Sequence, residues 1–90
     1  MTNQLETLRQ EIDSIDVQIF DLFEQRIAVA KQIGAYKKEQ DLIVLDPSRE
    51  NAKRDQVKAS VSNELEPYAL ELLEILMNVA KAVQETDHEL

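Results

Sequence analysis

The chain has no cysteine, no tryptophan, one glycine and two prolines among its 90 residues. Without cysteine, disulfides and thiolate metal ligands are excluded, and this absence suits a reducing compartment. No apolar run approaches the roughly 20 residues that a membrane-spanning helix needs, and the first residues lack the features of a secretory signal. We therefore expect a cytoplasmic protein with no membrane partner.

Basic residues are also few, because 10 lysines and arginines against 18 aspartates and glutamates give a formal net charge of -8. Such a chain repels phosphate-rich surfaces, so we expect no nucleic-acid partner. One histidine and no glycine-rich phosphate loop leave histidine-mediated proton transfer and dinucleotide binding without their usual residues. We expect no metal and no cofactor. An enzyme of this composition would act by binding, orientation and fixed charge.

Apolar residues from Leu5 to Tyr36 recur at alternating spacings of three and four, which predicts one long amphipathic helix over about 3–39. One position of this apolar stripe holds Arg26, and a guanidinium is costly to bury unless an anion meets it. Lys37 lies eleven residues further on, facing the same way, roughly 16 Å along the axis. Two cations on an otherwise apolar face indicate a binding site for an anion.

Gly34 lies beside the same stripe, inside the predicted helix, where glycine costs about 1 kcal/mol relative to alanine. Two explanations stay open for it. A second helix could cross closely at this point, or a ligand could approach the backbone.

The helical periodicity stops between Gln40 and Leu45. The apolar run at 42–45 has no second candidate strand to pair with. We therefore expect an extended connector whose apolar side chains pack against the helices.

Two further helices are expected after the connector. Asp46 followed by Pro47 is a strong start signal, with Asp46 as the N-cap, and predicts a helix over about 46–61. A third helix is predicted over about 66–85, again with a proline in its first turn. The expected fold is a single all-α domain over residues 1–90.

Several polar residues lie at the edges of apolar faces, and each has an ordinary explanation when taken alone. Arg26 could pair with a core acid, Lys37 could extend to solvent, and Gln84 could be an ordinary residue at a helix end. Asp46 could simply cap the second helix, with its neighbours in solvent. Taken together, three cations, two carboxylates and an amide predict a polar pocket inside a helical bundle, formed by Arg26, Lys37, Asp46, Arg49, Glu50 and Gln84.

These residues, in this order and at these separations, resemble the all-helical class of chorismate mutases. The resemblance rests on Leu8–Asp16, Arg26, Ile33–Lys37 and Asp46–Glu50 and covers nearly the whole chain. It implies a three-helix protomer with one long N-terminal helix in an intertwined homodimer. It also implies the intramolecular Claisen rearrangement of chorismate to prephenate, a step of aromatic amino-acid biosynthesis, without a cofactor or a covalent intermediate.

The resemblance assigns roles to the cations and the amide. Arg26 is expected to bind a substrate carboxylate, with Arg49 adding positive charge nearby. Lys37 and Gln84 are expected to donate hydrogen bonds to the ether oxygen, where negative charge grows as its bond to the ring breaks.

The same resemblance assigns the ring hydroxyl of the substrate to Asp46 and Glu50. It also shows one departure. Ala80 stands where the family often has a serine that forms a hydrogen bond to the substrate. One binding contact is therefore missing or replaced.

Arg9 is expected, by resemblance, to bind a carboxylate in the site of the other protomer. Arg9 and Lys37 are 28 residues apart, roughly 42 Å along one helix, which is too far for both to touch one small molecule. If both serve one site, Arg9 comes from another copy. The expected partners are thus a dianionic small molecule and a second copy of the chain, with a regulatory partner protein left open.

Two alternatives stay open. The same fold supports isochorismate pyruvate lyase, although the complete set of Asp46, Arg49 and Glu50 fits the mutase better. A helical dimerisation module without catalysis would use the apolar stripe only as an interface. Such a module has no need for Arg26 on that stripe.

Overall fold

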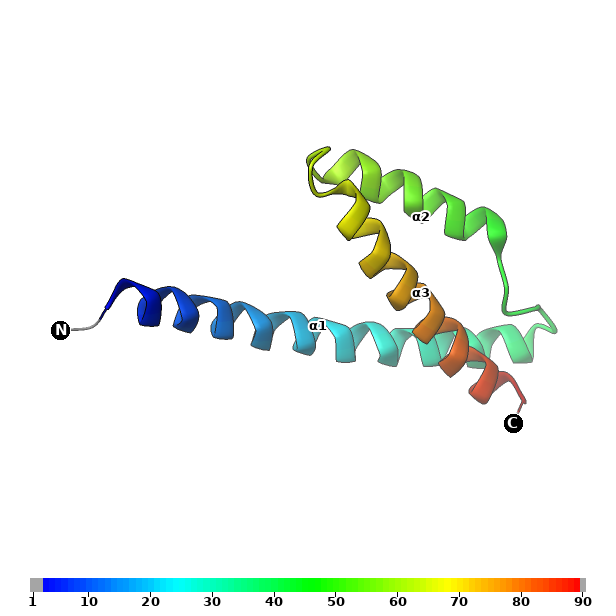
Figure 1. Ribbon diagram of the computed structural model, residues 1–90. Coiled ribbons are helices and arrows are strands. Elements are labelled where there is room, and N and C mark those ends of the chain that lie inside the picture. Colours follow the sequence, from blue (N-terminus) through cyan, green and yellow to red (C-terminus); the bar gives the residue numbers. More distant parts are fainter. Residues whose placement is uncertain (1–2, 90) are drawn as a thin grey trace.

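The computed structural model describes residues 3–89 as three helices, α1 (Gln4–Glu39), α2 (Pro47–Ser60) and α3 (Glu66–Glu89) (Figure 1). No strand occurs in this part of the chain, so the all-helical, three-helix prediction is confirmed. The third helix was expected to end at about 85 and instead continues to Glu89. Residues 86–89 include no glycine or proline that would end the helix at 85.

Local signals fix both ends of α1. Asn3 caps the first turn, its side-chain oxygen accepting from the Glu6 backbone N–H at 3.0 Å. At the other end Asp41 takes a left-handed conformation (φ 58°), which aspartate tolerates better than most residues. Leu42 then donates its N–H to the Lys37 carbonyl at 2.7 Å. This turn ends the helix and sends the connector back toward α2.

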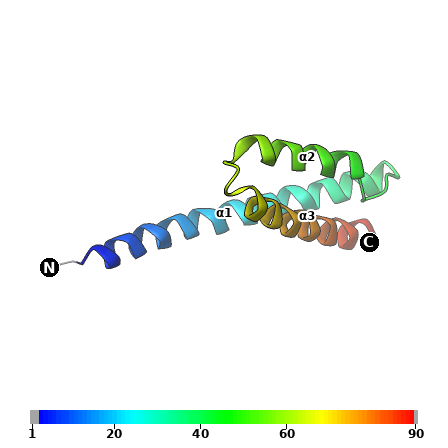
Figure 2. The same ribbon diagram turned by 45° about the horizontal axis from the view of Figure 1, so that its top comes forward.

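The three helices form two layers, one made by α1 and the other by α2 and α3. The hairpin of α2 and α3 lies across the C-terminal half of α1 (Figures 1 and 2). α3 packs against both other helices, whereas α1 and α2 have no backbone contact with each other in the described residues. The space between α1 and α2 is therefore occupied by side chains and can accommodate a ligand.

The core is small and lies where α3 crosses α1. Its buried apolar side chains are those of Ala30, Val44, Leu73 and Met77. The crossing point is Gly34, where the backbone of Gln84 occupies the place that a side chain would fill. Of the two explanations for the glycine, the structure shows the close helix crossing.

The connector packs less than the sequence analysis predicted. Of its four apolar residues only Val44 is buried, while Ile43 is 78% exposed and Leu42 and Leu45 are each 49% exposed. The prediction that all four pack against the helices was wrong. The connector is a single segment at the edge of the molecule, so only the side chain of Val44 becomes buried.

The N-terminal half of α1 extends beyond the hairpin, and no other element of the described residues packs against it (Figures 1 and 2). The radius of gyration is 17.0 Å, against about 12 Å for a compact domain of this length. The accessible surface is 7199 Å², against about 5,400 Å² for a compact monomer of this mass. Most of the apolar stripe is uncovered there, including Leu5, Leu8, Ile12, Ile15, Ile19 and Leu22.

None of the helices in the described residues is both long enough and apolar enough to cross a membrane.

Candidate active site

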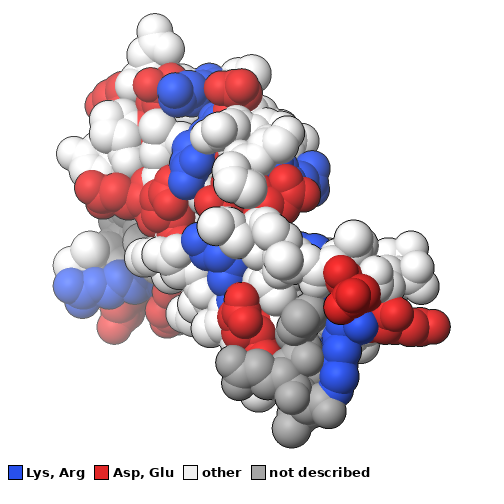
Figure 3. Space-filling view, turned by 90° about the vertical axis from the view of Figure 1, so that its right-hand side faces the viewer, with Lys and Arg blue, Asp and Glu red and all other residues white. Residues whose placement is uncertain are grey.

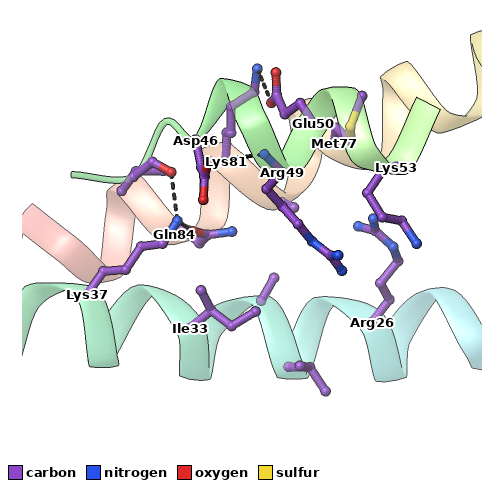
Figure 4. Close-up of a pocket in the computed structure, with 14 residues that line it drawn as sticks. Arg26, Ile33, Lys37, Asp46, Arg49, Glu50, Lys53, Met77, Lys81 and Gln84 are labelled. Carbon is purple, nitrogen blue, oxygen red and sulfur yellow. Dashed lines mark hydrogen bonds and ion pairs between the residues drawn. The ribbon is translucent and has the colours of Figure 1, made fainter. Parts of the chain in front are cut away.

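A cleft of about 440 Å³ lies between the C-terminal half of α1 and the hairpin of α2 and α3 (Figure 4). Its size falls within the range of small-molecule sites. All three helices and the connector contribute side chains to its walls. Seven of the eight residues predicted for the site line it, namely Arg26, Lys37, Asp46, Arg49, Glu50, Ala80 and Gln84.

Lys37 and Gln84 meet at one end of the cleft. The Lys37 ammonium donates to the Val44 carbonyl at 2.7 Å and to Gln84 Oε1 at 3.1 Å. The lysine is therefore partly buried and held in place, which differs from the alternative of a side chain extending to solvent. Two of its three N–H groups are used, and one remains for a ligand.

The same contact sets the orientation of the Gln84 amide. An ammonium only donates, so the amide oxygen must face Lys37 and the NH₂ group must face away from it. Gln84 is 8% exposed, and no described partner accepts from its NH₂ group. Among the residues that the structure describes, no buried side-chain nitrogen lacks a partner, so this unpartnered NH₂ group is accessible from the cleft that Gln84 lines. The Lys37 ammonium and the Gln84 NH₂ group are thus two hydrogen-bond donors at the same end of the cleft.

Arg26 lies toward the other end of the cleft and is fixed by the backbone of α3. Its Nη1 donates to the Leu76 carbonyl at 3.1 Å. Among the described residues no carboxylate lies within ion-pair distance of the guanidinium. The ion pair with a core acid, considered from the sequence, is therefore not found. The remaining N–H groups can donate to a ligand.

Arg49 and Asp46 come from the start of α2. Asp46 Oδ1 accepts from the Arg49 backbone N–H at 3.1 Å, so the aspartate is an N-cap, as its position predicted. The Arg49 side chain then descends into the cleft toward α1 (Figure 4). By capping the first turn of α2, Asp46 therefore also helps to direct the Arg49 guanidinium into the cleft.

Glu50 is held in a network of charges between α2 and α3. Its side chain is 16% exposed, and Oε2 lies 2.9 Å from the Lys81 ammonium and Oε1 3.8 Å from Arg54. Arg54 in turn donates to both carboxylate oxygens of Glu74, at 2.6 and 3.2 Å. That hydrogen bond holds the pKa of the Glu74 carboxyl below its ordinary value. Glu50 is thus oriented by its partners.

Lys53 and Lys81 also line the cleft, and the sequence analysis missed both. A signal for each was present. Lys53 follows Arg49 by four residues, and Lys81 follows Met77 by four, so each lies on the cleft-facing side of its helix. In the described residues no group of three or more potential metal ligands occurs.

Arg9 lies far from this cleft. It belongs to the uncovered half of α1, is exposed, and does not line the cleft of its own chain. The structure therefore places it apart from the other seven predicted residues.

Positive charge is concentrated in the cleft of an acidic chain. Five cationic side chains and two carboxylates line it, a formal excess of three positive charges, whereas the whole chain carries -8. On the end of the molecule that carries the connector, basic and acidic side chains are interspersed (Figure 3). The cationic excess is thus a property of the cleft and not of that outer surface.

Comparison with known proteins agrees with this arrangement. The family model for chorismate mutase type II matches residues 8–85. A chorismate mutase from Methanocaldococcus jannaschii is 29% identical over 87 residues, which cover 94% of this chain and 88% of that protein. No solved structure is a significant match. The match spans the cleft residues of all three helices, and the chain belongs to the chorismate mutase type II family.

Proposed function

We propose that the cleft binds chorismate and catalyses its rearrangement to prephenate, the reaction of the family to which the chain belongs. The observation that carries the proposal is the pair of Lys37 and Gln84, in which the ammonium donates to the amide oxygen at 3.1 Å and leaves the Gln84 NH₂ group as a second donor in a cleft of cationic excess. Chorismate is a dianion with two carboxylates, a ring hydroxyl and an ether oxygen. The cleft offers a matching group for each.

The reaction needs no group to enter or leave. The ether C–O bond breaks while a C–C bond forms between the enolpyruvyl methylene and the ring, within one molecule. Catalysis then consists of holding the side chain over the ring and of stabilising charge in the transition state. Arg26 and Arg49, with N–H groups directed into the cleft, would fix the carboxylates and so restrict the substrate to the folded conformation.

Lys37 and Gln84 would stabilise the transition state. Negative charge grows on the ether oxygen as its bond to the ring breaks, so donors aimed there bind the transition state more tightly than bound chorismate. Because their mutual hydrogen bond and the Val44 carbonyl hold both groups before substrate arrives, little reorganisation is needed.

Asp46 and Glu50 are the acceptors for the ring hydroxyl. Asp46 uses Oδ1 for the helix cap and keeps its second oxygen for a ligand. Glu50 keeps lone pairs beyond those that face Lys81 and Arg54. Ala80 presents only a methyl group to the cleft, so the hydrogen bond that the family often takes from a serine is not made by this side chain.

A homodimer would complete both the fold and the site. Eight large apolar side chains between Leu5 and Leu22 are each more than 40% exposed, and a contiguous apolar surface of this kind marks an interaction site in soluble proteins. Arg9 lies on the same half-helix, outside its own cleft. We propose that this half of α1 packs against a second copy and that Arg9 enters the partner's cleft to bind a substrate carboxylate.

Turnover is the direct test. Chorismate should be consumed by the purified protein, followed as a loss of ultraviolet absorbance, with prephenate as the product. Isochorismate offered in parallel should yield no salicylate, whereas salicylate and pyruvate would favour the lyase. A folded protein that consumes neither substrate would overturn the proposal and leave a helical interaction module.

A further inference from the structure

We propose that Lys53 is a further substrate-binding residue, which binds, together with Arg26, a carboxylate of the substrate at the end of the cleft away from Lys37. This inference rests on the proposed function and extends it. The resemblance to the chorismate mutases assigns no role to a residue at this position. The observations that carry it are the direction of the side chain, its lack of an anionic partner, and the charges around it.

Two lysines of the cleft lie outside the set of residues assigned by resemblance, and they differ in one respect. Lys81 is neutralised, because its ammonium lies 2.9 Å from Glu50 Oε2. Lys53 donates to Gln56 Oε1 at 2.8 Å, which is a neutral amide on its own helix. No carboxylate of the described residues lies within ion-pair distance of Lys53. Only Lys81 therefore has a protein counter-ion.

Lys53 also points at the group with which it would act. It is half-buried, lines the cleft, and extends from α2 toward Arg26, which rises from α1 (Figure 4). Arg49 enters the same space from α2 (Figure 4). None of these three cations has a carboxylate partner among the described residues.

Three uncompensated cations around one space disfavour each other, and the repulsion is poorly screened where water is partly excluded. A bound carboxylate removes that cost and gains hydrogen bonds from charged donors. Arg26 is fixed by the Leu76 carbonyl, so it sets the position of the anion. Lys53 has a flexible stem and rotatable donors, so it can turn from Gln56 to the ligand.

The kinetic signature follows from the chemistry. A carboxylate keeps its charge throughout the rearrangement, so a contact to it stabilises bound substrate and transition state equally. Removing such a contact raises KM and leaves kcat unchanged. Lys53→Gln should therefore raise KM for chorismate about tenfold, the loss typical of one hydrogen bond to a charged group, with kcat within about twofold of the parent.

A matched control is available on the same helix. Lys58→Gln removes the same charge from α2, but Lys58 is exposed and does not line the cleft. It should leave KM within about twofold, whereas Lys53→Arg should restore most of the affinity that Lys53→Gln loses. Lys53→Met, which keeps the aliphatic stem, should match Lys53→Gln. Equal KM values for Lys53→Gln and Lys58→Gln, or a loss confined to kcat, would overturn the inference.

Direct binding separates this inference from the proposed function. Prephenate, a dicarboxylate, is titrated calorimetrically into the parent and into Lys53→Gln, with helical content checked by circular dichroism. Binding about tenfold weaker in Lys53→Gln supports the role of Lys53, even if the parent fails to turn over chorismate and the proposed function falls. Equal binding by both proteins, or no binding by the parent, overturns the role of Lys53.

Discussion

A Cβ atom placed on Gly34 would lie 2.8 Å from Gln84 Cα and 3.0 Å from the Gln84 carbonyl oxygen. Both are backbone atoms of α3, so no rotation of a side chain relieves the contact. The single glycine thus sets the distance between α1 and α3. That distance also decides whether the Gln84 amide reaches Lys37, three residues along α1 from the glycine.

Gly34→Ala should therefore impair the site as well as the fold. Alanine gains about 1 kcal/mol of helix propensity, but forcing the two backbones apart costs typically 1–3 kcal/mol. We expect a lower melting temperature together with a kcat reduced by tenfold or more, because the Lys37–Gln84 contact opens. Thermal unfolding and turnover measured on one preparation test this. A variant as stable and as active as the parent would show that the helices can separate without cost.

A second prediction concerns acid stability and the Arg54–Glu74 pair. The hydrogen bond from Arg54 lowers the pKa of Glu74 below its ordinary value of 4.5. The unfolded chain therefore binds this proton at a higher pH than the folded chain does. The stability from the pair is present above that ordinary value and is lost as the pH falls through the lower folded value.

Melting temperatures of the parent and Glu74→Gln should thus differ at neutral pH and converge in acid. Glu71→Gln is the control, because it removes the same charge from α3 at an exposed residue that makes no ion pair. A difference between parent and Glu74→Gln that stays constant down to strongly acidic pH would assign the effect to packing instead.

The features that the sequence predicts well are those set by neighbouring residues. Asp46 and Pro47 predict the start of α2, because a capping side chain and the fixed φ angle of proline both act within one helical turn. Helical spacing likewise places Arg26 and Lys37 on one face, and both line the cleft. Local helix geometry decides which side chains share one side of each helix. The fold then only has to bring the polar sides of the three helices together to form the cleft.

The features that it predicts poorly depend on distances between helices. The Glu50–Lys81 pair needs the spacing of α2 from α3, which no local pattern contains. The outward direction of Ile43 depends on how few neighbours the connector meets at the edge of the molecule. Gly34 is a further example. Its place inside the helix indicated that some group approaches the backbone closely, but the sequence could not show whether that group is a second helix or a ligand.

A third prediction concerns the proposed homodimer. Sedimentation at micromolar concentration should give twice the chain mass of 10.3 kDa. Ile15→Glu places a charge on the uncovered apolar stripe and should yield monomers with little activity, because burying an unpaired carboxylate at an interface is strongly unfavourable. Gln18→Glu adds the same charge to the polar side of the half-helix and should leave the dimer intact.

Mixing variants tests whether the site is shared. At chorismate concentrations near the KM of the parent, Arg9→Ala and Lys37→Ala chains should each show little activity alone, the first because its KM is raised and the second because its kcat is lowered. If Arg9 serves the partner's cleft, mixed dimers rebuild one intact site in two, and activity returns on mixing. A parent that sediments as a fully active monomer would exclude both the shared site and the dimer.

The last prediction concerns the breaking bond. Lys37→Ala should lower kcat by about 10²–10³ or more, the usual cost of removing one preorganised donor to a developing oxyanion, while KM changes far less. Gln84→Ala should lower kcat by a smaller factor, because a neutral amide stabilises the charge less than an ammonium does. Arg9→Ala is the comparison, because a carboxylate contact is equally strong before and during reaction and its loss raises KM.

Gln84→Glu adds a pH test of the same idea. An ionised carboxylate at this position repels the negative charge that grows on the ether oxygen, whereas its protonated form can donate to that oxygen. Lys37, whose ammonium lies 3.1 Å from the present amide oxygen, would favour the ionised form. Activity should therefore be low at neutral pH and rise only toward acid, as the introduced carboxyl gains its proton. A Gln84→Glu enzyme with the pH profile of the parent would show that Gln84 does not face the breaking bond.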